Sequence, residues 1–333
     1  MRVLSGRYRL TEPIGSGGMA PVWQAHDDVL DRTVAVKLLT AEHVADPEAF
    51  ARARNEARCA ARIAHPNVAA VYDFGTTRRS RQGAAYLVME RVQGPLLSDY
   101  LRQGPLHPTF AVRVCAEVAA GLAAAHSQGI VHRDIKPANV VLTPTGAKLL
   151  DFGIAARVGE VDRSPDGLVL GTPAYIAPER LDGHPVAPEA DLYGLGVLLY
   201  LTLTGLIPWN ESTDDGLLRA HLETPPIPLP AIDALPSEAA DTCHACLDKD
   251  PAQRPTALAA AMILAASVDA QVYLPPLPVL EPPPRPPPVV PAVAEPRAAV
   301  DPAAVGPLAA VDPLSGPVDP LRAATTPRRH PGP

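Results

Sequence analysis

One octet of residues constrains this chain more than any other feature: it runs from His132 to Asn139 and reads His-Arg-Asp-Ile-Lys-Pro-Ala-Asn. It brings a carboxylate, an ammonium group and an amide into one short loop. Asp151-Phe152-Gly153 begins twelve residues after Asn139, a spacing that fits a loop followed by a hairpin. These side chains supply a base, a phosphate contact and ligands for magnesium, so the pattern predicts one site for a triphosphate and its metal.

The composition limits the class of protein. Of the 333 residues 47% are hydrophobic, enough for a sizeable core, and the net charge of −7 argues against nucleic acid or an anionic membrane as the main partner. Four cysteines do not make a disulfide framework in so long a chain. Cys243 and Cys246 form a C-x-x-C pair, which indicates either a metal or redox site or two small residues on one helix face. A closed zinc site needs four ligands and no second pair lies nearby in sequence, which favours the helix face.

The sequence has no pattern of a targeting signal or a membrane span. Met1 to Arg7 has no long apolar segment behind a basic start, so we expect no signal peptide. The most apolar run, 192–207, is shorter than the roughly 20 residues of a spanning helix and is predicted to be a buried helix. We therefore expect a cytoplasmic protein without an integral membrane segment.

The residues up to about 92 predict a small lobe rich in strands. A glycine-rich turn joins the first two strands, which indicates a hairpin. Asp46 and Pro47 predict a helix start, since Asp caps a helix and Pro suits its first position, and this helix is expected to reach about Ala64. Strands are expected over 7–11, 21–26, 33–39, 68–74 and 85–90.

Beyond Gly94-Pro95 the apolar residues recur at helical spacing. Gly129 is expected to cap the first long helix. Helices are predicted over 108–128, 189–204, 214–222, 237–247 and 256–268, with short strands at 140–142 and 148–150. The pattern indicates an α+β fold in which a small β lobe is joined to a larger α lobe.

The composition changes sharply near Tyr273. The segment 273–333 holds nearly half of the 41 prolines, including the run 282–288. Such a segment cannot offset its ordering entropy by burial, so we expect a disordered or polyproline-II tail. A docking role for the proline run is the alternative to a passive tail.

These motifs, in this order and spacing, resemble those of the bacterial Hanks-type serine/threonine protein kinases. The resemblance covers a domain of residues 7–268, with an N-lobe of about 7–92 and a C-lobe of about 93–268. It implies a bilobal protein kinase fold with a β-rich N-lobe and a helical C-lobe. It also implies transfer of the γ-phosphoryl group of ATP to Ser and Thr hydroxyls of proteins, the chain itself included.

The resemblance assigns the nucleotide to the small lobe. Glycines there would let backbone N–H groups approach the phosphates, although Ala20 replaces the family's third glycine. The main chain of Glu90 and Val92 would hydrogen-bond adenine, with Met89 as gatekeeper. The other nucleotide-binding residues implied are Ile14, Gly15, Ser16, Gly17, Gly18, Met19, Val22 and Ala35, the last two against the adenine faces.

Lys37, in Val34-Ala35-Val36-Lys37, would hold the α- and β-phosphates. A lysine inside an apolar strand is costly unless it is paired. Glu56 on the following helix matches the family position for its partner, and Glu42 and Glu48 are alternatives.

The resemblance gives the central loop its chemistry. Asp134 would be the catalytic base, and Lys136 would reach the γ-phosphate. Asn139 and Asp151 would ligate Mg²⁺, or Mn²⁺ in its place, because both offer hard oxygen ligands. Asp191 would hold the loop through backbone N–H groups. His132 and Phe152 would be structural.

A second segment of the C-lobe, 171–179, resembles the one that receives the substrate. Lys136 together with Thr172 marks the serine/threonine branch. Glu179 is expected to form a structural ion pair with Arg254. Ser164 is the only hydroxyl between Ile154 and Leu170, and our hypothesis is that it is autophosphorylated.

Two other functions compete with an active protein kinase. A pseudokinase scaffold would bind nucleotide or partners without catalysis, but the chain keeps the four residues whose loss would favour it, namely Lys37, Asp134, Asn139 and Asp151. A small-molecule phosphotransferase of related fold usually lacks the Ala-Pro-Glu at 177–179. The expected partners are protein substrates, and dimerisation through the N-lobe is common in the family.

Overall fold

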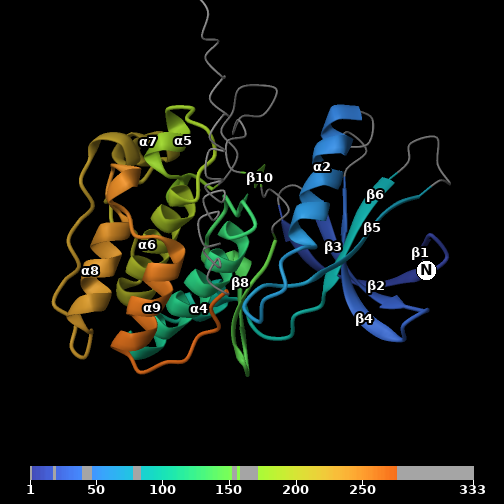
Figure 1. Cartoon of the computed structure of the whole chain (residues 1–333), viewed down its shortest axis with the longest axis horizontal. Coiled ribbons are helices and arrows are strands. Elements are labelled where there is room, and N and C mark those ends of the chain that lie inside the picture. The colour runs from blue at the N-terminus through green and yellow to red at the C-terminus, as the bar shows by residue number, and fades with distance from the viewer. Residues whose placement is uncertain are drawn as a thin grey trace, which may run out of the picture. The chain divides into compact units, whose positions relative to one another are not determined.

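The computed structural model describes residues 2–17, 20–39, 47–77, 84–151, 156–157 and 172–275. Its N-terminal part is an antiparallel sheet with the strand order β1-β2-β3-β4-β6-β5, against which the helix α2 lies (Figure 1). The strands are β1 (Val3–Leu4), β2 (Tyr8–Gly17), β3 (Ala20–Asp27), β4 (Arg32–Leu38), β5 (Val71–Thr77) and β6 (Ala84–Glu90), and α2 spans Pro47–Ala60.

Alternation along β4 separates the two faces of this sheet. Val34, Val36 and Leu38 are buried in a cluster with Leu4, Tyr8 and Leu10 among others. Ala35 belongs instead to a second cluster that includes Ala57 of α2. Since successive side chains of a strand point to opposite faces, Lys37 shares the face of Ala35, the one that α2 covers.

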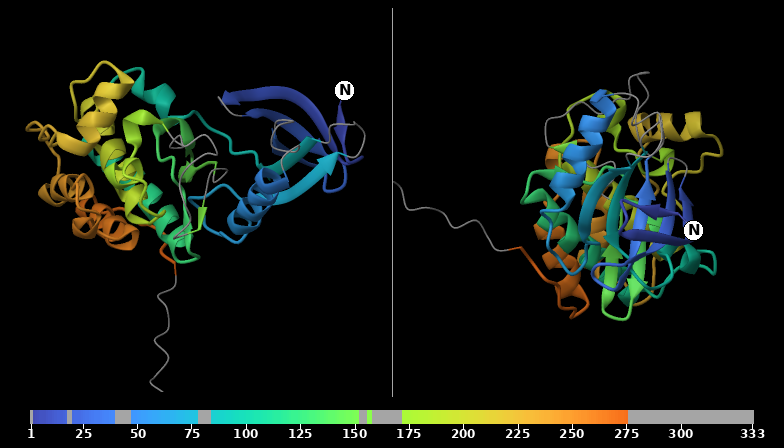
Figure 2. Two further views of the ribbon diagram at one scale, coloured as in Figure 1. Left: turned by 90° about the horizontal axis from the view of Figure 1, so that it is seen from above. Right: turned by 90° about the vertical axis from the view of Figure 1, so that its right-hand side faces the viewer.

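The C-terminal part is built around the long helix α4 (Pro108–His126), which is buried over most of its length. The helices α6 (Glu189–Thr204) and α9 (Ala257–Ser267) pack against it, and Figure 2 shows this helical part from two further sides. The remaining helices are α3 (Leu97–Leu101), α5 (Pro178–Leu181), α7 (Asp214–Glu223) and α8 (Ser237–Cys246). Short strands β7 (Ile130–Val131), β8 (Val140–Thr143), β9 (Gly146–Leu149) and β10 (Ala156–Arg157) and the 3-10 turns η1 (Pro137–Asn139), η3 (Pro173–Tyr175) and η4 (Pro251–Gln253) complete it.

The C-x-x-C pair lies on α8, where it faces a glycine of α6. A Cβ atom at Gly196 would come within 2.8 Å of the Cβ of Cys246, so the two helices approach closely only because this position lacks a side chain. Both thiols are buried, and burial raises the pKa of Cys246 to about 12 and that of Cys243 well above its usual range. The structure therefore supports the prediction of two small residues on one helix face.

The predicted elements are confirmed, with the largest shifts at three boundaries. Strand β2 continues to Gly17, whereas the sequence predicted its end at Thr11. Helix α2 ends at Ala60 instead of about Ala64. Strand β5 begins at Val71 instead of Val68, because the residues before it pair elsewhere: Val68 bridges to Leu149 of β9, and the Ala69 N–H donates to the Leu149 carbonyl. The backbone that leaves α2 is thus tied to the C-lobe hairpin β8–β9.

The apolar run 192–207 lies almost entirely within α6, which is buried as predicted. Among the described residues, length and composition alone would allow α4 to cross a membrane, and 78% of its apolar window is buried inside the protein.

The described chain continues past α9 to residue 275. We call residues 270–275 the C-terminal strap. Ala270 and Val272 pack against the helical core, and the Tyr273 carbonyl lies 2.9 Å from Nε2 of His65. The folded part therefore extends a few residues beyond the predicted boundary at 268, while the prediction for the tail falls on residues outside the description from 276 onward.

Candidate active site

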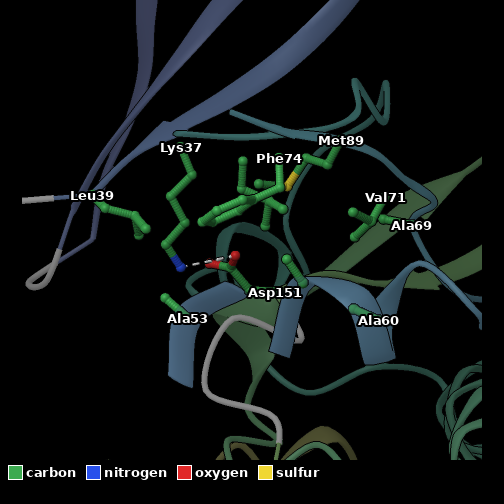
Figure 3. Close-up of a pocket in the computed structure, with 11 residues that line it drawn as sticks. Lys37, Leu39, Ala53, Ala60, Ala69, Val71, Phe74, Met89 and Asp151 are labelled. Carbon is green, nitrogen blue, oxygen red and sulfur yellow. Dashed lines mark hydrogen bonds and ion pairs between the residues drawn. The ribbon is translucent and has the colours of Figure 1, made fainter. Parts of the chain in front are cut away.

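Lys37 and Asp151 meet at one end of an apolar pocket. Their Nζ and Oδ1 atoms are 3.0 Å apart, although the two residues are 114 positions apart in the chain (Figure 3). The pocket has a volume of about 550 Å³ including its open mouth. It is lined by Leu39, Ala53, Ala57, Ala60, Ala69, Val71, Phe74, Leu87 and Met89 besides the ion pair. The β4 lysine thus reaches the carboxylate that follows the hairpin β8–β9.

The acidic partner predicted for Lys37 is not tested by this contact. Glu56 and Glu48 lie on α2, but the structure does not describe their side chains. Glu42 lies in the segment 40–46, which is not among the described residues. Ala53, Ala57 and Ala60 of α2 line the pocket that Lys37 enters. Pairing of Glu56 with Lys37 stays a prediction, and Asp151 is a partner that the sequence analysis assigned only to metal.

Three donors converge on the carboxylate of Asp134. Lys136 Nζ lies 2.7 Å from Oδ2, Asn139 Nδ2 donates to Oδ2 at 3.0 Å, and Thr172 Oγ1 donates to Oδ1 at 3.1 Å. Lys136 also donates to Thr172 Oγ1 at 2.7 Å, which closes the ring. The turn η1 produces this arrangement, because it folds Asn139 back so that its amide also donates to the Asp134 carbonyl at 2.7 Å.

This cluster keeps Asp134 ionised. Burial by itself would raise the pKa of the carboxyl, but the hydrogen bond and charge of Lys136, with the amide of Asn139, outweigh it and lower the pKa below its usual range. Tyr175 experiences the opposite effect: burial first, and then the negative charge of Asp134, raise its pKa to about 12. Asp134 is therefore a charged acceptor at neutral pH, able to orient a hydroxyl.

Asp191 holds the backbone of the same loop from below. Its Oδ2 accepts the N–H of His132 at 2.8 Å and its Oδ1 that of Arg133 at 2.7 Å, and His126 Nε2 lies 2.8 Å from Oδ2. Asp191 is only 1% exposed. The prediction that it anchors the loop through N–H groups is confirmed.

Two residues of the site adopt backbone conformations that are uncommon outside glycine. Arg133 has a φ of 72° and Asp151 a φ of 56°. Such positions persist where surrounding contacts fix them, and they gather at functional sites. For Arg133 the fixing contacts include Asp191 on its N–H and Arg180, which donates to its carbonyl at 2.6 Å. Sequence reasoning missed Arg180, since nothing in the pattern marks it as buried.

The predicted adenine contacts lie where the two lobes join. The Glu90 N–H donates to the Ala70 carbonyl at 2.8 Å, and the Glu90 side chain forms an ion pair with Lys148 of β9. The side chain of Val92 is buried beside Val141. Glu90 thus ties the end of β6 to the C-lobe hairpin, a role that sequence reasoning also missed.

The glycine-rich segment forms the paired ends of β2 and β3. Gly15 lies opposite Val22, Ser16 opposite Pro21, and Gly17 opposite Ala20. Val22 packs with Ala35 in the cluster beneath, whereas Ile14 is exposed. Gly18 and Met19, at the tip, lie outside the described residues.

Helix α5 is fastened to the rest of the C-lobe by an ion pair. Arg254 donates from its two terminal nitrogens to the two carboxylate oxygens of Glu179, at 2.7 and 2.8 Å. The guanidinium is fully buried, and it also donates to the carbonyls of Asp248 and Glu189. The predicted pair is confirmed. Phe152 and Ser164 lie outside the described residues.

Comparison with known proteins agrees with this geometry. Residues 8–265 match the protein kinase domain family. Serine/threonine-protein kinase PknA of Mycobacterium tuberculosis is 43% identical over 254 residues, which cover 75% of this chain and 58% of that protein. PknB of the same species is 40% identical over 229 residues (68% and 37%), and PrkC of Bacillus subtilis is 39% identical over 226 residues (67% and 34%). The chain therefore spans less than two thirds of the length of these relatives. It belongs to the protein kinase domain family, among the bacterial Hanks-type serine/threonine kinases.

Proposed function

We propose that this chain is a serine/threonine protein kinase that transfers the γ-phosphoryl group of ATP to Ser and Thr hydroxyls of proteins and to itself. One observation carries the proposal: Lys136, Asn139 and Thr172 converge on the Asp134 carboxylate. The lysine and threonine of that ring are the pair that marks the serine/threonine branch. The bacterial relatives that match are named serine/threonine-protein kinases, which supports the same assignment.

In this proposal Asp134 accepts a hydrogen bond from the acceptor hydroxyl and directs its oxygen at the γ-phosphorus. Its lowered pKa fits orientation better than early proton removal, since a weak base takes the proton only as the new P–O bond forms. Lys136 would follow the γ-phosphate and balance its charge. Phosphoryl transfer asks mainly for positioning and charge, and both residues provide these.

The N-lobe would hold the rest of the nucleotide. Lys37 would bind the α- and β-phosphates, with Glu56 as its partner when ATP is bound. Adenine would lie between the lobes, against Val22 and Ala35, and would bond to the main chain at Glu90 and Val92. Backbone N–H groups of the turn at 15–19 would face the phosphates.

Asn139 and Asp151 fit a divalent metal. Nδ2 of Asn139 makes both described bonds to Asp134, so its side-chain oxygen faces elsewhere, and the Asp151 carboxylate is about one-third exposed. Both are hard oxygen donors, which suits Mg²⁺ and also Mn²⁺. A divalent ion bound there would neutralise phosphate charge, and these two side chains would set its position.

The remaining assignments are proposed on the same basis. The catalytic unit is residues 7–268 with the strap beyond it, divided near residue 92, and the disordered tail that the sequence predicts for 273–333 would begin after the strap. The partners are protein substrates. A cytoplasmic location, dimerisation through the N-lobe and autophosphorylation at Ser164 also remain proposals.

The proposal is tested with purified chain, radiolabelled ATP, magnesium and myelin basic protein. Lys37→Met, Asp134→Asn and Asp151→Asn should each lower turnover by about 10²-fold or more, because each removes charge or positioning needed in the transition state. Arg102→Ala, at an exposed surface pair, is the matched control and should leave the rate unchanged. Wild-type chain that binds nucleotide but labels neither itself nor the acceptor would refute the proposal.

A further inference from the structure

A buried histidine lies under the turn that carries Thr172. His221, near the end of α7, is fully buried, and α7 packs against η3, the turn Pro173–Tyr175. Its ring centroid lies 4.3 Å from that of Trp209 and 5.5 Å from that of Tyr193. This pocket of aromatic rings belongs to none of the groups assigned above.

The hydrogen bonds around His221 fix its tautomer. Its Nδ1 lies 2.8 Å from the hydroxyl oxygen of Tyr193. Lys249 also points Nζ at that oxygen, at 3.4 Å, and donates to the carbonyls of Ala220 and His221. An ammonium group only donates, so the tyrosine hydroxyl proton is left for Nδ1. Burial first, and then the charge of Lys249, lower the pKa of His221 to about 4, so the ring is neutral and carries its proton on Nε2.

The Nε2–H donor has no hydrogen-bond partner among the described residues, although it is buried. Buried donors are rarely left in this state, and each one calls for an explanation. The backbone oxygens of Pro173 and Ala174 approach the ring and raise its pKa against the main trend, but neither meets Nε2 with the geometry of a hydrogen bond. Proline has no N–H, so a carbonyl is what this backbone can offer to a donor.

We propose that His221 is a positioning residue for the protein acceptor: its Nε2–H closes a hydrogen bond onto the Pro173 or Ala174 carbonyl when an acceptor polypeptide is bound. The bond fixes the turn that begins at Thr172, whose hydroxyl contacts both Asp134 and Lys136. The inference rests on the proposed kinase function. It deepens that function by adding a residue for acceptor binding that lies outside the catalytic loop.

The prediction separates acceptor binding from chemistry. A bond made in both the bound acceptor complex and the transition state changes KM for the acceptor and leaves kcat unchanged. Loss of a single ordinary hydrogen bond corresponds to about a threefold to tenfold rise in that KM. KM for ATP should not move, because His221 is remote in sequence and contact from Lys37 and its pocket.

Two amide variants form the matched pair. His221→Gln places an NH₂ group near the position of Nε2 and should keep a KM for myelin basic protein within about twofold of wild type. His221→Asn reaches only the position of Nδ1, so it keeps the contact to Tyr193 and should show the raised KM. Leu222→Ala, on the same helix but exposed, should change neither constant.

Thermal unfolding of every variant shows whether a KM change merely follows instability, because both amides bury a polar group at the same site. A second measurement uses wild-type chain labelled with ¹⁵N-histidine. His221 should appear as the neutral Nε2–H tautomer, and its Nε2–H should exchange more slowly when the acceptor is added. The Nδ1–H tautomer, or equal acceptor KM for the two amides in an active enzyme, would overturn the inference alone. Wild-type chain without kinase activity would overturn the proposed function and this inference with it.

Discussion

At the scale of single residues, Asp191 shows how one side chain serves the site without touching a substrate. It is buried and accepts two backbone N–H groups from the catalytic loop. Burial alone would raise its pKa, but the hydrogen bond and charge of His126, with the loop N–H groups, lower it below its usual range. Its carboxylate is therefore charged in the folded protein throughout the neutral range.

This lowered pKa predicts a dependence of stability on pH. A carboxyl group whose folded pKa lies below its unfolded value of about 3.9 stabilises the fold above that value, and the contribution is lost as pH falls through the folded pKa. Asp191→Asn leaves one loop N–H without an acceptor, which should cost about 1–3 kcal/mol at pH 7. Urea unfolding of both proteins from pH 7 down to pH 3 should show this difference shrinking below about pH 4. A difference that stays constant over the range would contradict the role of the charge.

The sequence predicted which residues belong to the site, but it predicted only some of the contacts between them. The octet 132–139 and Asp151 predicted a shared site. Lys136 and Asn139 meet at Asp134, and Leu150, the residue before Asp151, bonds to Asn139 and His132 through its backbone. The contact between Lys37 and Asp151 was not predicted, because it depends on how close the two lobes lie, and no local pattern encodes that distance. The pair Glu90–Lys148 was missed for the same reason, and Arg180 was missed because nothing in the pattern marks it as buried.

At the scale of elements, close helix packing depends on a few positions without side chains. Gly196 of α6 is such a position, since an added Cβ would lie 2.8 Å from the Cβ of Cys246 on α8 and 3.0 Å from the Cγ of Leu247, which follows α8. Alanine is the better helix former by about 1 kcal/mol. Overpacking of a buried contact costs about 1–3 kcal/mol, so the clash outweighs the propensity.

Gly196→Ala should therefore lower the free energy of unfolding, against its helix propensity. Gly216→Ala on α7 is the control. Its added Cβ would meet the Glu211 carboxylate at 2.6 Å and the N-cap hydroxyl of Thr213 at 2.9 Å. Both side chains are exposed and can move aside, so this variant should lose less stability than Gly196→Ala. Urea denaturation of the two variants compares them directly. If Gly196→Ala is the more stable of the two, α6 and α8 are not held by this contact.

The ion pair between Glu179 and Arg254 joins two elements far apart in the chain. Removal of one partner of a buried pair leaves an uncompensated charge, which typically costs about 3–5 kcal/mol. Arg254→Met should therefore destabilise the protein strongly. Arg254→Met combined with Glu179→Gln should recover part of the loss, because no buried charge remains. Arg102→Ala, at a side chain 75% exposed, should cost no more than about 0.5 kcal/mol.

The order and type of the longer elements were predictable because each has a strong local signal. The apolar alternation of β4 and the helical spacing of α4 and α6 are examples. The short elements β1, β7, β10, α3 and α5 were missed, since two to five residues carry too little periodicity to stand out. The late start of β5 was missed because Val68 and Ala69 bond to the other lobe, a tertiary contact that overrides the local pattern.

At the scale of the whole molecule, the junction after α2 connects the lobes to the end of the folded chain. His65 Nδ1 accepts the N–H of Asn67, and its Nε2 lies 2.9 Å from the carbonyl of Tyr273 in the C-terminal strap. Asn67 in turn donates to the Ala147 carbonyl and accepts from the Leu149 N–H. The strap thus contacts the segment 65–67, which joins α2 to the hairpin β8–β9. Asp151 follows this hairpin by two residues.

The contact between His65 and Tyr273 moves the end of the folded part beyond the predicted boundary at 268. The sequence predicts the last helix over 256–268, and its composition changes near Tyr273. A chain that ends at 269 should keep autokinase activity, since every residue proposed for the site is retained. It should nevertheless unfold at lower urea concentration than a chain that ends at 275. The loss of the half-buried Val272 and of the bond from His65 should cost about 1–3 kcal/mol.

The chain ending at 275 should match the full-length protein in the same measurement, because a passive tail adds nothing to the fold. Equal unfolding free energies for the chains ending at 269 and 275 would show that the strap does not stabilise the junction, whereas loss of activity at 275 would assign the tail a part in catalysis.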